Sequence, residues 1–299
     1  MRITDEVMAV IQRQLSESLH ETVCVTGLIP VSGGDICDSF RVETDTRSVV
    51  YFAKCCNAAQ AGILEAEFGN LHMLHQAAEI HTPTPIAQMV NGGIAVLLLS
   101  YLSLDGPEHE FELGQRLSAL HRHTSKQYGL DFDNFIGLTG QRNHRSPSWL
   151  DFWWECRLYP QLQLAGEHGF APPLAGLQEP LKEACRRLLE SHQPPASLLH
   201  GDLWSGNKGY LTDGTPVIFD PACYYGDRET DIAFTEVFGG FSPEFYRGYQ
   251  LAWPLDNGYQ QRKALYNLYH LLNHLNMFGR SYLPSCLRQI QLLLNQGPE

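Results

Sequence analysis

The sequence is poor in basic residues and in long apolar segments. Its 299 residues include 21 Lys and Arg against 33 Asp and Glu, which gives a formal charge of −12. Nucleic acids and anionic membranes bind basic surfaces, so this balance argues against both as partners. The longest apolar run, residues 94–99, is far shorter than the roughly 20 residues that span a bilayer.

The spacing of the cysteines and the character of the amino terminus argue against two further classes of protein. The 8 cysteines contain no CxxC pair of the kind that binds zinc, and a chain of this length and composition needs no disulfide framework. Asp5, Glu6 and Gln12 interrupt the first segment, so a secretory signal peptide is not expected. We expect a cytoplasmic protein that is a monomer or a weak dimer. Most of its thiols should be buried, and the thiol of Cys37 is either chemically inert or redox-active.

The first hundred residues have the pattern of a small β-rich lobe. Two strand-like runs lie between residues 39 and 54, and a helical pattern follows at 58–78. Asn-Gly-Gly at residues 91–93 predicts a tight hairpin. The strand after it, 94–101, is almost wholly apolar and should be buried on both faces.

The rest of the chain has mainly helical periodicity and no internal repeat. We therefore predict an α+β protein with lobes at residues 1–101 and 102–299. Helices of the second lobe are expected at residues 111–123, 149–166, 174–192, 245–251, 262–280 and 285–295.

The segment LLHGDLWSGNKGYLTDGTPVIFDPA, residues 198–222, has the spacing that phosphoryl transfer requires. Asp202 and Asn207 lie five residues apart in a loop, and Asp220 follows an apolar strand eighteen residues after Asp202. A hairpin turn between them should bring Asp220 beside Asn207. Phosphoryl transfer needs a carboxylate at the attacking hydroxyl and oxygen ligands for Mg²⁺. We predict Asp202 as catalytic base, Asn207 and Asp220 as magnesium ligands, and His200 as a brace for the loop.

The amino-terminal lobe offers candidates for binding ATP. Lys54 follows a strand and is expected to meet a carboxylate of the next helix, either Glu65 or Glu67; Glu67 is favoured because it shares an edge with the apolar residues of that helix. Glycines allow backbone N–H groups to approach phosphates. Further nucleotide-binding candidates are Gly33, Gly34 and Asp35 in a glycine turn, and Ser100, Tyr101 and Leu102 in a hinge that should hold adenine.

These motifs resemble the protein-kinase-like fold, with HGD in place of the kinase HRD and FDP in place of DFG. Longer segments resemble the fructosamine kinase (ketosamine 3-kinase) family. These are PVSGGDI, LHRHTSKQYGLDFDNFIG, WLDFWWECRLYPQL, HGDLWSGN and DPACYYGDRETDIAFTEVFGGF. The resemblance follows the chain order over most of its length.

The resemblance implies a two-lobed protein-kinase-like fold and ATP- and Mg²⁺-dependent phosphorylation of the 3-hydroxyl of a ketosamine, free or protein-bound. The product decomposes and releases the amine; bacterial members are said to prefer ribulosamines or erythrulosamines. The sugar could meet the flat faces of aromatic residues, which otherwise belong to the core. The candidates for substrate contact are Trp204, Tyr224 and Tyr225 for the sugar, and Asp227 and Glu229 for its protonated amine.

Three other interpretations remain open at this point. A different small-molecule kinase of this fold, acting on aminoglycosides or choline, would share the catalytic loop. A nucleotide-binding pseudokinase would be expected to lack Lys54, Asp202, Asn207 or Asp220, all of which are present. A protein kinase would need an activation segment ending in APE, which does not follow Asp220.

Asp231 is expected to tie down the catalytic loop.

Overall fold

The protein, represented by a computed structural model, is described for residues 5–31, 37–45 and 49–295. It forms two compact units. Unit 1 contains Met1–His109 and Gly209–Asp220, and unit 2 contains Glu110–Lys208 and Pro221–Glu299. The segment that carries Asp220 therefore belongs to the same unit as Lys54.

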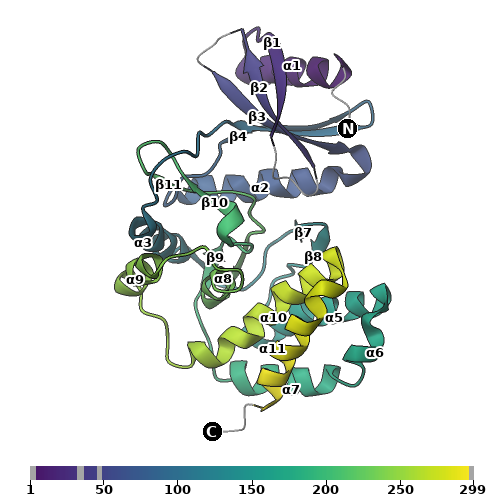
Figure 1. The fold of residues 1–299 in the computed structure, drawn as a ribbon, viewed down its shortest axis with the longest axis vertical. Coiled ribbons are helices and arrows are strands. Elements are labelled where there is room, and N and C mark those ends of the chain that lie inside the picture. Colours follow the sequence, from purple (N-terminus) through teal and green to yellow (C-terminus); the bar gives the residue numbers. More distant parts are fainter. Residues whose placement is uncertain (1–4, 32–36, 46–48, 296–299) are drawn as a thin grey trace. The chain divides into compact units, whose positions relative to one another are not determined.

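Unit 1 consists of a five-stranded antiparallel sheet with two helices. The strands are β1 (Val25–Val31), β2 (Asp38–Thr44), β3 (Val50–Asn57), β4 (Pro85–Asn91) and β5 (Ile94–Ser100), and the helices are α1 (Asp5–Leu19) and α2 (Ala61–Ala77). The strand order is β1-β2-β3-β5-β4 (Figure 1). The predicted hairpin joins β4 to β5, and Gly92 and Gly93 both have the positive φ that its turn requires.

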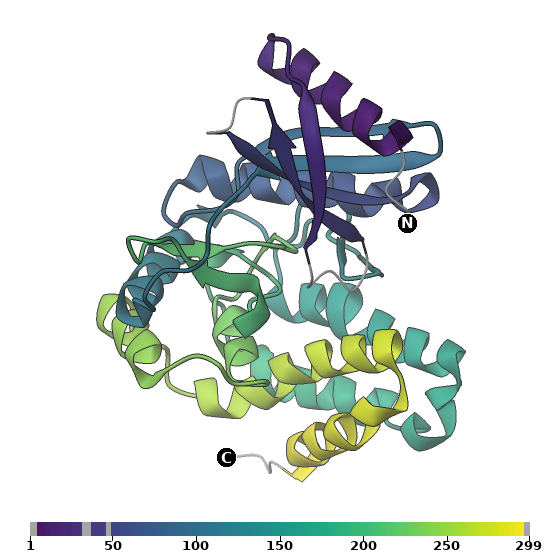
Figure 2. The same ribbon diagram turned by 45° about the horizontal axis from the view of Figure 1, so that its top comes forward.

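Strand β5 is buried on both faces, as its apolar sequence predicts. Val96 and Leu98 pack in one core cluster with residues of α1, whereas Leu97 and Leu99 pack in another with residues of α2. Successive side chains of a strand point to opposite faces, so the two helices cover opposite sides of the sheet (Figures 1 and 2). Lys54 pairs with Leu97 in the ladder between β3 and β5, and this core therefore fixes its position.

The chain returns to unit 1 through a second, two-stranded sheet. It is formed by β10 (Lys208–Tyr210) and β11 (Pro216–Ile218), with Gly214 at positive φ in the turn between them, as predicted. The N–H of Ile218 donates a 3.0 Å hydrogen bond to the carbonyl of His81. Asp220 thus follows a strand that is anchored to the body of unit 1.

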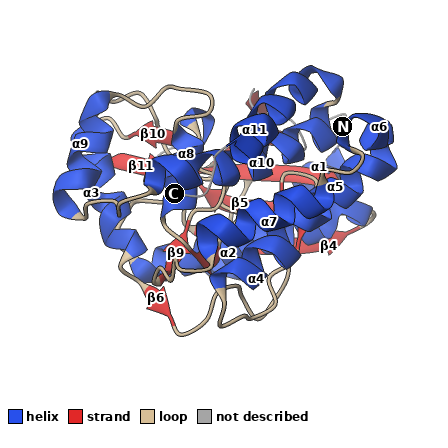
Figure 3. Cartoon of the chain, turned by 90° about the horizontal axis from the view of Figure 1, so that it is seen from below, coloured by secondary structure: helices blue, strands red, loops and turns tan. Residues whose placement is uncertain are grey.

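Unit 2 is mainly helical, and its strands are short (Figure 3). With the antiparallel sheet of unit 1, this confirms the predicted α+β class. Along the part of the chain that is described, no helix is both long and apolar enough to cross a membrane. The α-helices are α3 (Glu110–His121), α4 (Trp149–Trp153), α5 (Tyr159–Ala165), α6 (Ala171–Leu174), α7 (Gln178–Leu189), α8 (Glu229–Thr235), α9 (Pro243–Ala252), α10 (Tyr259–Phe278) and α11 (Leu283–Asn295). A π-helical segment, η3 (Gly166–Phe170), and two 3-10 helices, η4 (Ser205–Asn207) and η5 (Arg280–Tyr282), accompany them.

Several elements of unit 2 differ from the prediction. The helix expected at 149–166 is interrupted by a π-helical segment, η2 (Trp154–Leu158). The short strands β6, β7, β8 and β12 were not predicted, because two or three residues are too few for a periodic pattern to show. Their bounds are β6 (Thr124–Ser125), β7 (Asn134–Ile136), β8 (Thr139–Gln141) and β12 (Tyr224–Gly226); β12 and β6 flank β9 (Ala196–Leu199) in one sheet.

Helix α10 provides much of the aromatic core of unit 2. The Tyr266 and Tyr269 rings meet the ring of Trp153 edge to face, with centroids 5.0 and 5.7 Å apart. One turn on, His270 stacks on Phe234 of α8 at 3.6 Å between ring centroids. His270 is therefore a packing residue, as its place in a helical apolar pattern indicates.

His270 should make the stability of the protein depend on pH. The pKa of His270 is lowered to about 3, chiefly by burial and in part by the neighbouring His274 and Arg157, while Asp231 acts in the opposite direction. The unfolded chain takes up this proton near pH 6.5, so the free energy of unfolding should fall as the pH drops below that value. We expect His270→Phe, which keeps a ring against Phe234, to lose this contribution.

Urea unfolding of both proteins between pH 7.5 and 4.5, roughly the range over which histidine gains its proton, measures this difference. The variant should gain stability relative to the native protein as the pH falls. A difference that stays constant with pH would contradict a neutral, buried imidazole at this position.

Candidate active site

A lysine between two carboxylates forms the charged part of the candidate site in unit 1. Nζ of Lys54 lies 2.8 and 3.0 Å from the carboxylate oxygens of Glu67 on α2, and 2.6 Å from Oδ1 of Asp220. Glu67 rather than Glu65 is thus the helix carboxylate that meets Lys54, as the helix spacing favours. The arrangement joins β3, α2 and the segment after β11 at one cation.

The three charges of this cluster differ in exposure. The side chains of Lys54 and Glu67 are 12% and 11% exposed, whereas that of Asp220 is 44% exposed. Burial by itself lowers the pKa of Lys54, but the carboxylates of Asp220 and Glu67 outweigh it and hold this pKa above its ordinary value. Burial raises the pKa of Glu67 to about 7, against the effect of Lys54. Lys54 therefore stays protonated at neutral pH.

Asp220 has an unusual backbone conformation. Its φ is +58°, a region that non-glycine residues rarely occupy. Strained residues of this kind cost about 1–3 kcal/mol and gather at functional sites. An exposed carboxylate oxygen is also a ligand that Mg²⁺ prefers. The residue present at this position fits a magnesium site.

In unit 2, the segment after the buried strand β9 forms a compact loop. The N–H of Asp202 donates to Nδ1 of His200 at 3.2 Å, so His200 braces the loop as predicted. Gly201 has a φ of +81°, and a Cβ there would lie 2.0 Å from the carbonyl oxygen of Ala222. Nδ2 of Asn207 donates to the backbone oxygen of Asp202 at 2.9 Å. Because this contact uses the amide nitrogen, Oδ1 of Asn207 is the atom that can ligate a cation.

A buried carboxylate on α8 holds this loop in place. Oδ2 and Oδ1 of Asp231 accept hydrogen bonds from the backbone N–H groups of His200 and Gly201, at 2.7 and 2.9 Å. Nε2 of His121 lies 3.1 Å from Oδ2, and its Nδ1 lies 2.8 Å from the hydroxyl of Tyr249. Although burial raises the pKa of Asp231, its hydrogen bonds and the nearby histidines hold it below the ordinary value. The predicted role of Asp231 in tying down the loop is confirmed.

Two further supports of the loop were not recognised in the sequence. His121 is fully buried, with its Nε2 3.1 Å from Oδ2 of Asp231. Lys208, next to Asn207, forms an ion pair with Glu110 in which both side chains are 5% exposed. The partners lie 110 and 98 residues apart in the chain. No local pattern predicts such contacts.

The aromatic residues proposed to meet a sugar are placed differently from one another. Trp204 is 37% exposed and its ring covers Gly206. Tyr225 is half-buried, with the guanidinium of Arg145 above its ring. Tyr224 is buried, and the guanidinium carbon of Arg157 lies 3.8 Å from its ring centroid. Trp204 and Tyr225 keep accessible surface for a ligand, and Tyr224 belongs to the core.

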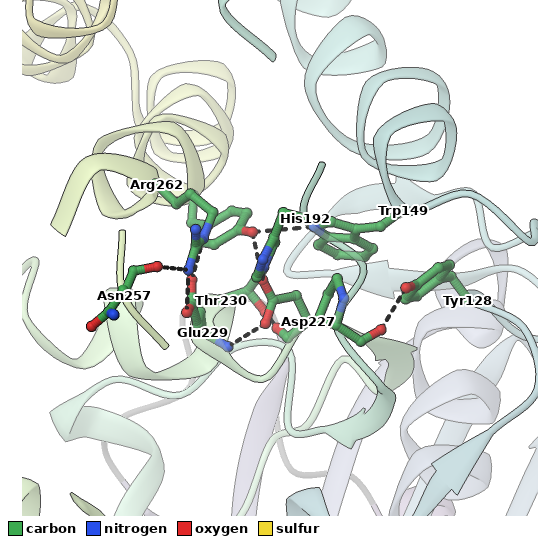
Figure 4. Close-up of polar contacts among 10 residues, drawn as sticks. Tyr128, Trp149, His192, Asp227, Glu229, Thr230, Asn257 and Arg262 are labelled. Atoms are coloured by element: carbon green, nitrogen blue, oxygen red, sulfur yellow. Dashed lines mark hydrogen bonds and ion pairs between the residues drawn. The ribbon is translucent and has the colours of Figure 1, made fainter. Parts of the chain in front are cut away.

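Asp227 and Glu229 are buried in a polar network (Figure 4). Oδ2 of Asp227 lies 2.7 Å from Nε2 of His192 and accepts a 2.6 Å hydrogen bond from Tyr266. Both oxygens of Glu229 accept hydrogen bonds from Arg262, each at 2.7 Å. This placement argues against the predicted contact of the two carboxylates with a substrate amine, because each is enclosed and bonded to other side chains.

The same network resembles a metal site only in part. Ligand atoms of His192, Asp227 and Glu229 lie within 4.8 Å of one another. The guanidinium of Arg262 already neutralises Glu229, however, and a cation there would have to displace it. The network is therefore a structural one that ties α8 to α10 and to the segment before β9.

The remaining candidates for nucleotide binding lie at the end of β5 or outside the described residues. Ser100, Tyr101 and Leu102 are half-buried, and Oγ of Ser100 accepts a 2.8 Å hydrogen bond from the N–H of Thr84. Their contact with adenine stays a prediction. So does the approach of Asp220 to Asn207, because these residues belong to different units. Gly33, Gly34 and Asp35 lie outside the described residues.

Comparison with known proteins identifies close relatives over nearly the whole chain. The family model described as fructosamine kinase matches residues 7–296. A protein of Vibrio parahaemolyticus serotype O3:K6, described as a probable ketoamine kinase, is 42% identical over 290 residues, which cover 96% of this chain and 97% of the relative.

Solved structures support the same relationship. A crystal structure named as a fructosamine-3-kinase of Haemophilus somnus 129PT matches with a TM-score of 0.87 and 28% identity, over 95% of this chain and 97% of that one. The ternary complex of APH(2″)-IIa with streptomycin and ATP matches with a TM-score of 0.60 and 15% identity, over 97% of both chains. The second match shows a shared fold alone.

The substitution Asp231→Asn tests the support of the loop. Its amide can accept through one atom only and would direct an N–H₂ group at a backbone donor. We expect the free energy of unfolding to fall by about 2–4 kcal/mol, because a buried donor loses its partner. Turnover, followed by ADP release, should fall at least about tenfold, since Asp202 loses its fixed direction.

Asp151→Asn is the matched control, because Asp151 is exposed in the first turn of α4. Its effect on unfolding should stay within about 0.5 kcal/mol. Equal stability and turnover in the Asp231 and Asp151 variants would show that the clamp is not required.

Proposed function

Because the chain belongs to the fructosamine kinase family, a family of phosphotransferases, we propose that it transfers the γ-phosphoryl group of ATP to the 3-hydroxyl of a ketosamine. The acceptor would be a ribulosamine, erythrulosamine or fructosamine adduct of an amine or of a protein lysine. The phosphorylated adduct then decomposes and releases the amine. The activity would therefore reverse glycation.

Asp202 is proposed as the catalytic base. The 3-hydroxyl oxygen forms a bond to the γ-phosphorus, the bond from that phosphorus to the bridging oxygen of ADP breaks, and the hydroxyl proton passes to Asp202. A base in this reaction orients the hydroxyl more than it drives the step. This role is supported by the fixed direction of Asp202, whose own N–H is bonded to His200 and whose neighbours are held by Asp231.

Lys54, Asn207 and Asp220 are proposed to bind the magnesium–ATP complex. When bound, Mg²⁺ neutralises charge on the phosphates. Lys54 would bind phosphate oxygens while Glu67 holds its ammonium group, and Asn207 and Asp220 would supply oxygen ligands. Gly33, Gly34, Asp35 and the hinge at residues 100–102 are proposed to complete the nucleotide site, with Trp204 and Tyr225 as sugar contacts.

The observation that carries the proposal is the HGD loop itself, in a chain that matches the family over residues 7–296. Asp231 fixes the backbone of the loop, and Asn207 is bonded to Asp202 across it. A pseudokinase would be expected to lack Lys54, Asp202, Asn207 or Asp220, and all four are present.

A coupled ADP-release assay with magnesium and ATP tests the function directly. Ribulose-lysine, fructose-lysine, kanamycin and choline are offered in parallel. We expect turnover on the ketosamines. Turnover on kanamycin or choline alone would retain a kinase and discard the ketosamine as substrate, and binding of ATP without any turnover would favour the pseudokinase.

In the same assay, Asp202→Ala should lower kcat by about 10²–10⁴-fold, the usual contribution of a catalytic base. Affinity for ATP and the unfolding free energy should change little, because the side chain is half-buried on a loop that other residues hold. Retained turnover would exclude Asp202 as the base.

Asp220→Ala should affect the nucleotide instead. Removing this carboxylate takes away a proposed magnesium ligand, so the strengthening of ATP binding by Mg²⁺ should be lost in isothermal titration. Asp213→Ala, on the exposed turn between β10 and β11, is the control. Magnesium dependence that survives in the Asp220 variant would place the cation elsewhere.

A further inference from the structure

Unit 2 contains a small polar cavity to which the proposed catalytic roles assign no ligand. Its volume is about 260 Å³, and its walls come from β8, from the helical segment of η2 and α5, and from α10. Ligand sites for drug-sized molecules span about 300–1,000 Å³, so this cavity suits a smaller molecule. Gln141, Arg157, Gln161 and Tyr269 line its buried part, and the exposed Arg142 and Glu167 are also among its lining residues.

The buried lining groups donate and accept hydrogen bonds, and a carboxylate is absent from them. Gln141, Gln161 and Tyr269 are each 2–3% exposed. The guanidinium carbon of Arg157 lies 3.8 and 4.7 Å from the ring centroids of Tyr224 and Phe152. Its hydrogen bonds to the carbonyl of Arg142 and to Oδ1 of Asn143, 2.6 and 2.7 Å long, fix its plane. Neutral amides, a phenol and a fixed guanidinium are suited to hydroxyl groups rather than to an ammonium ion.

Hydrogen bonds hold the two amides in one orientation each. Nε2 of Gln141 donates to Oδ1 of Asn134 at 2.8 Å, and its Oε1 accepts from the hydroxyl of Tyr269 at 2.7 Å. Nε2 of Gln161 donates to Oδ1 of Asn273 at 3.1 Å, and its Oε1 accepts from Nδ2 of Asn276 at 2.7 Å. An amide oxygen has two lone pairs, so each can accept a second hydrogen bond.

One wall of the cavity is joined to the catalytic loop. Nε2 of Gln141 also donates to the carbonyl oxygen of Ala222 at 3.2 Å, and the N–H of Ala222 donates to the carbonyl of His200 at 2.9 Å. The cavity wall is thus linked within unit 2, through Ala222 and His200, to the loop that carries the proposed base.

We propose that this cavity is the subsite for the polyhydroxy chain of the acceptor, with Gln141, Gln161 and Tyr269 as specificity-determining residues. The proposal rests on the proposed function, since it assigns a place to the sugar of that reaction. Hydroxyls beyond the reacting one bond to the fixed amides and the phenol. The cavity then discriminates among acceptors by the length and hydroxylation of the sugar.

The test compares Gln161→Leu and Tyr269→Phe with the native protein in the ADP-release assay, using erythrulose-lysine, ribulose-lysine and fructose-lysine. Each substitution removes a buried polar group at nearly constant shape. We expect KM for the preferred acceptor to rise about tenfold or more, the cost of one lost buried hydrogen bond. KM for ATP should stay within about twofold, and the preference among the three sugars should shrink.

Gln260→Leu is the matched control. It makes the same change at an exposed residue of a different cavity, of about 880 Å³, lined by α8, α9, the segment before α10 and the start of α10. This variant should keep the native KM values. Thermal unfolding of each variant shows whether a raised KM reflects the loss of a substrate contact or the loss of the folded state. If Gln161→Leu does not fold, the KM values of Tyr269→Phe provide the test.

The outcomes distinguish a failure of the subsite proposal from a failure of the proposed function on which it rests. Native turnover on ketosamines with an unchanged acceptor KM in both cavity variants would overturn the subsite alone. A raised acceptor KM in Gln260→Leu instead would assign the sugar to the larger cavity. Absence of native turnover on all three ketosamines would overturn the proposed function, and the subsite with it.

Discussion

A single buried carboxylate, Asp231, holds the loop on which the candidate site depends. It accepts hydrogen bonds from the backbone N–H groups of His200 and Gly201, two consecutive donors, and is itself 1% exposed. Buried donors that lose their acceptor cost about 1–3 kcal/mol each, so the loop has one strongly preferred course. Gly201 permits that course through its positive φ and lack of a side chain. The direction of Asp202 follows from it.

Ionic contacts in this protein divide into those that fix structure and those that remain available for chemistry. Glu229 with Arg262 and Glu110 with Lys208 are buried pairs, which resist disruption because removing one partner leaves an uncompensated charge. Lys54 differs, because one of its two carboxylates, Asp220, is 44% exposed. A phosphate or a cation can reach that contact from solvent. Of the buried pairs, Glu110 with Lys208 adjoins the catalytic loop of unit 2, whereas the pair that is open to exchange belongs to unit 1.

Neutral polar side chains that line the small cavity are also held in fixed positions. Gln141 is bonded to Asn134, to Tyr269 and to the carbonyl of Ala222, so its amide cannot rotate without breaking several contacts. Groups held in this way recognise a ligand with little loss of conformational entropy. The π-helical segment η2 contributes a second fixed group to this cavity, because it carries Arg157 into the interior beside Tyr224.

Local sequence patterns were enough to predict the α+β class, the buried strand β5 and the glycine turn before it, which the structure confirms. The roles of Asp202, Asn207, Asp220 and Lys54 were predicted from patterns of the same kind and stay predictions. Those features are local, since they depend on periodicity, turn chemistry and short spacings. Tertiary structure decided which polar residues face inward. Asp227 and Glu229 were predicted from the sequence to meet the substrate amine, but partners 33–39 residues away enclose them. His121 likewise became a support of the loop through a contact across 110 residues. Such pairings arise only when distant segments pack together, and no short pattern encodes them.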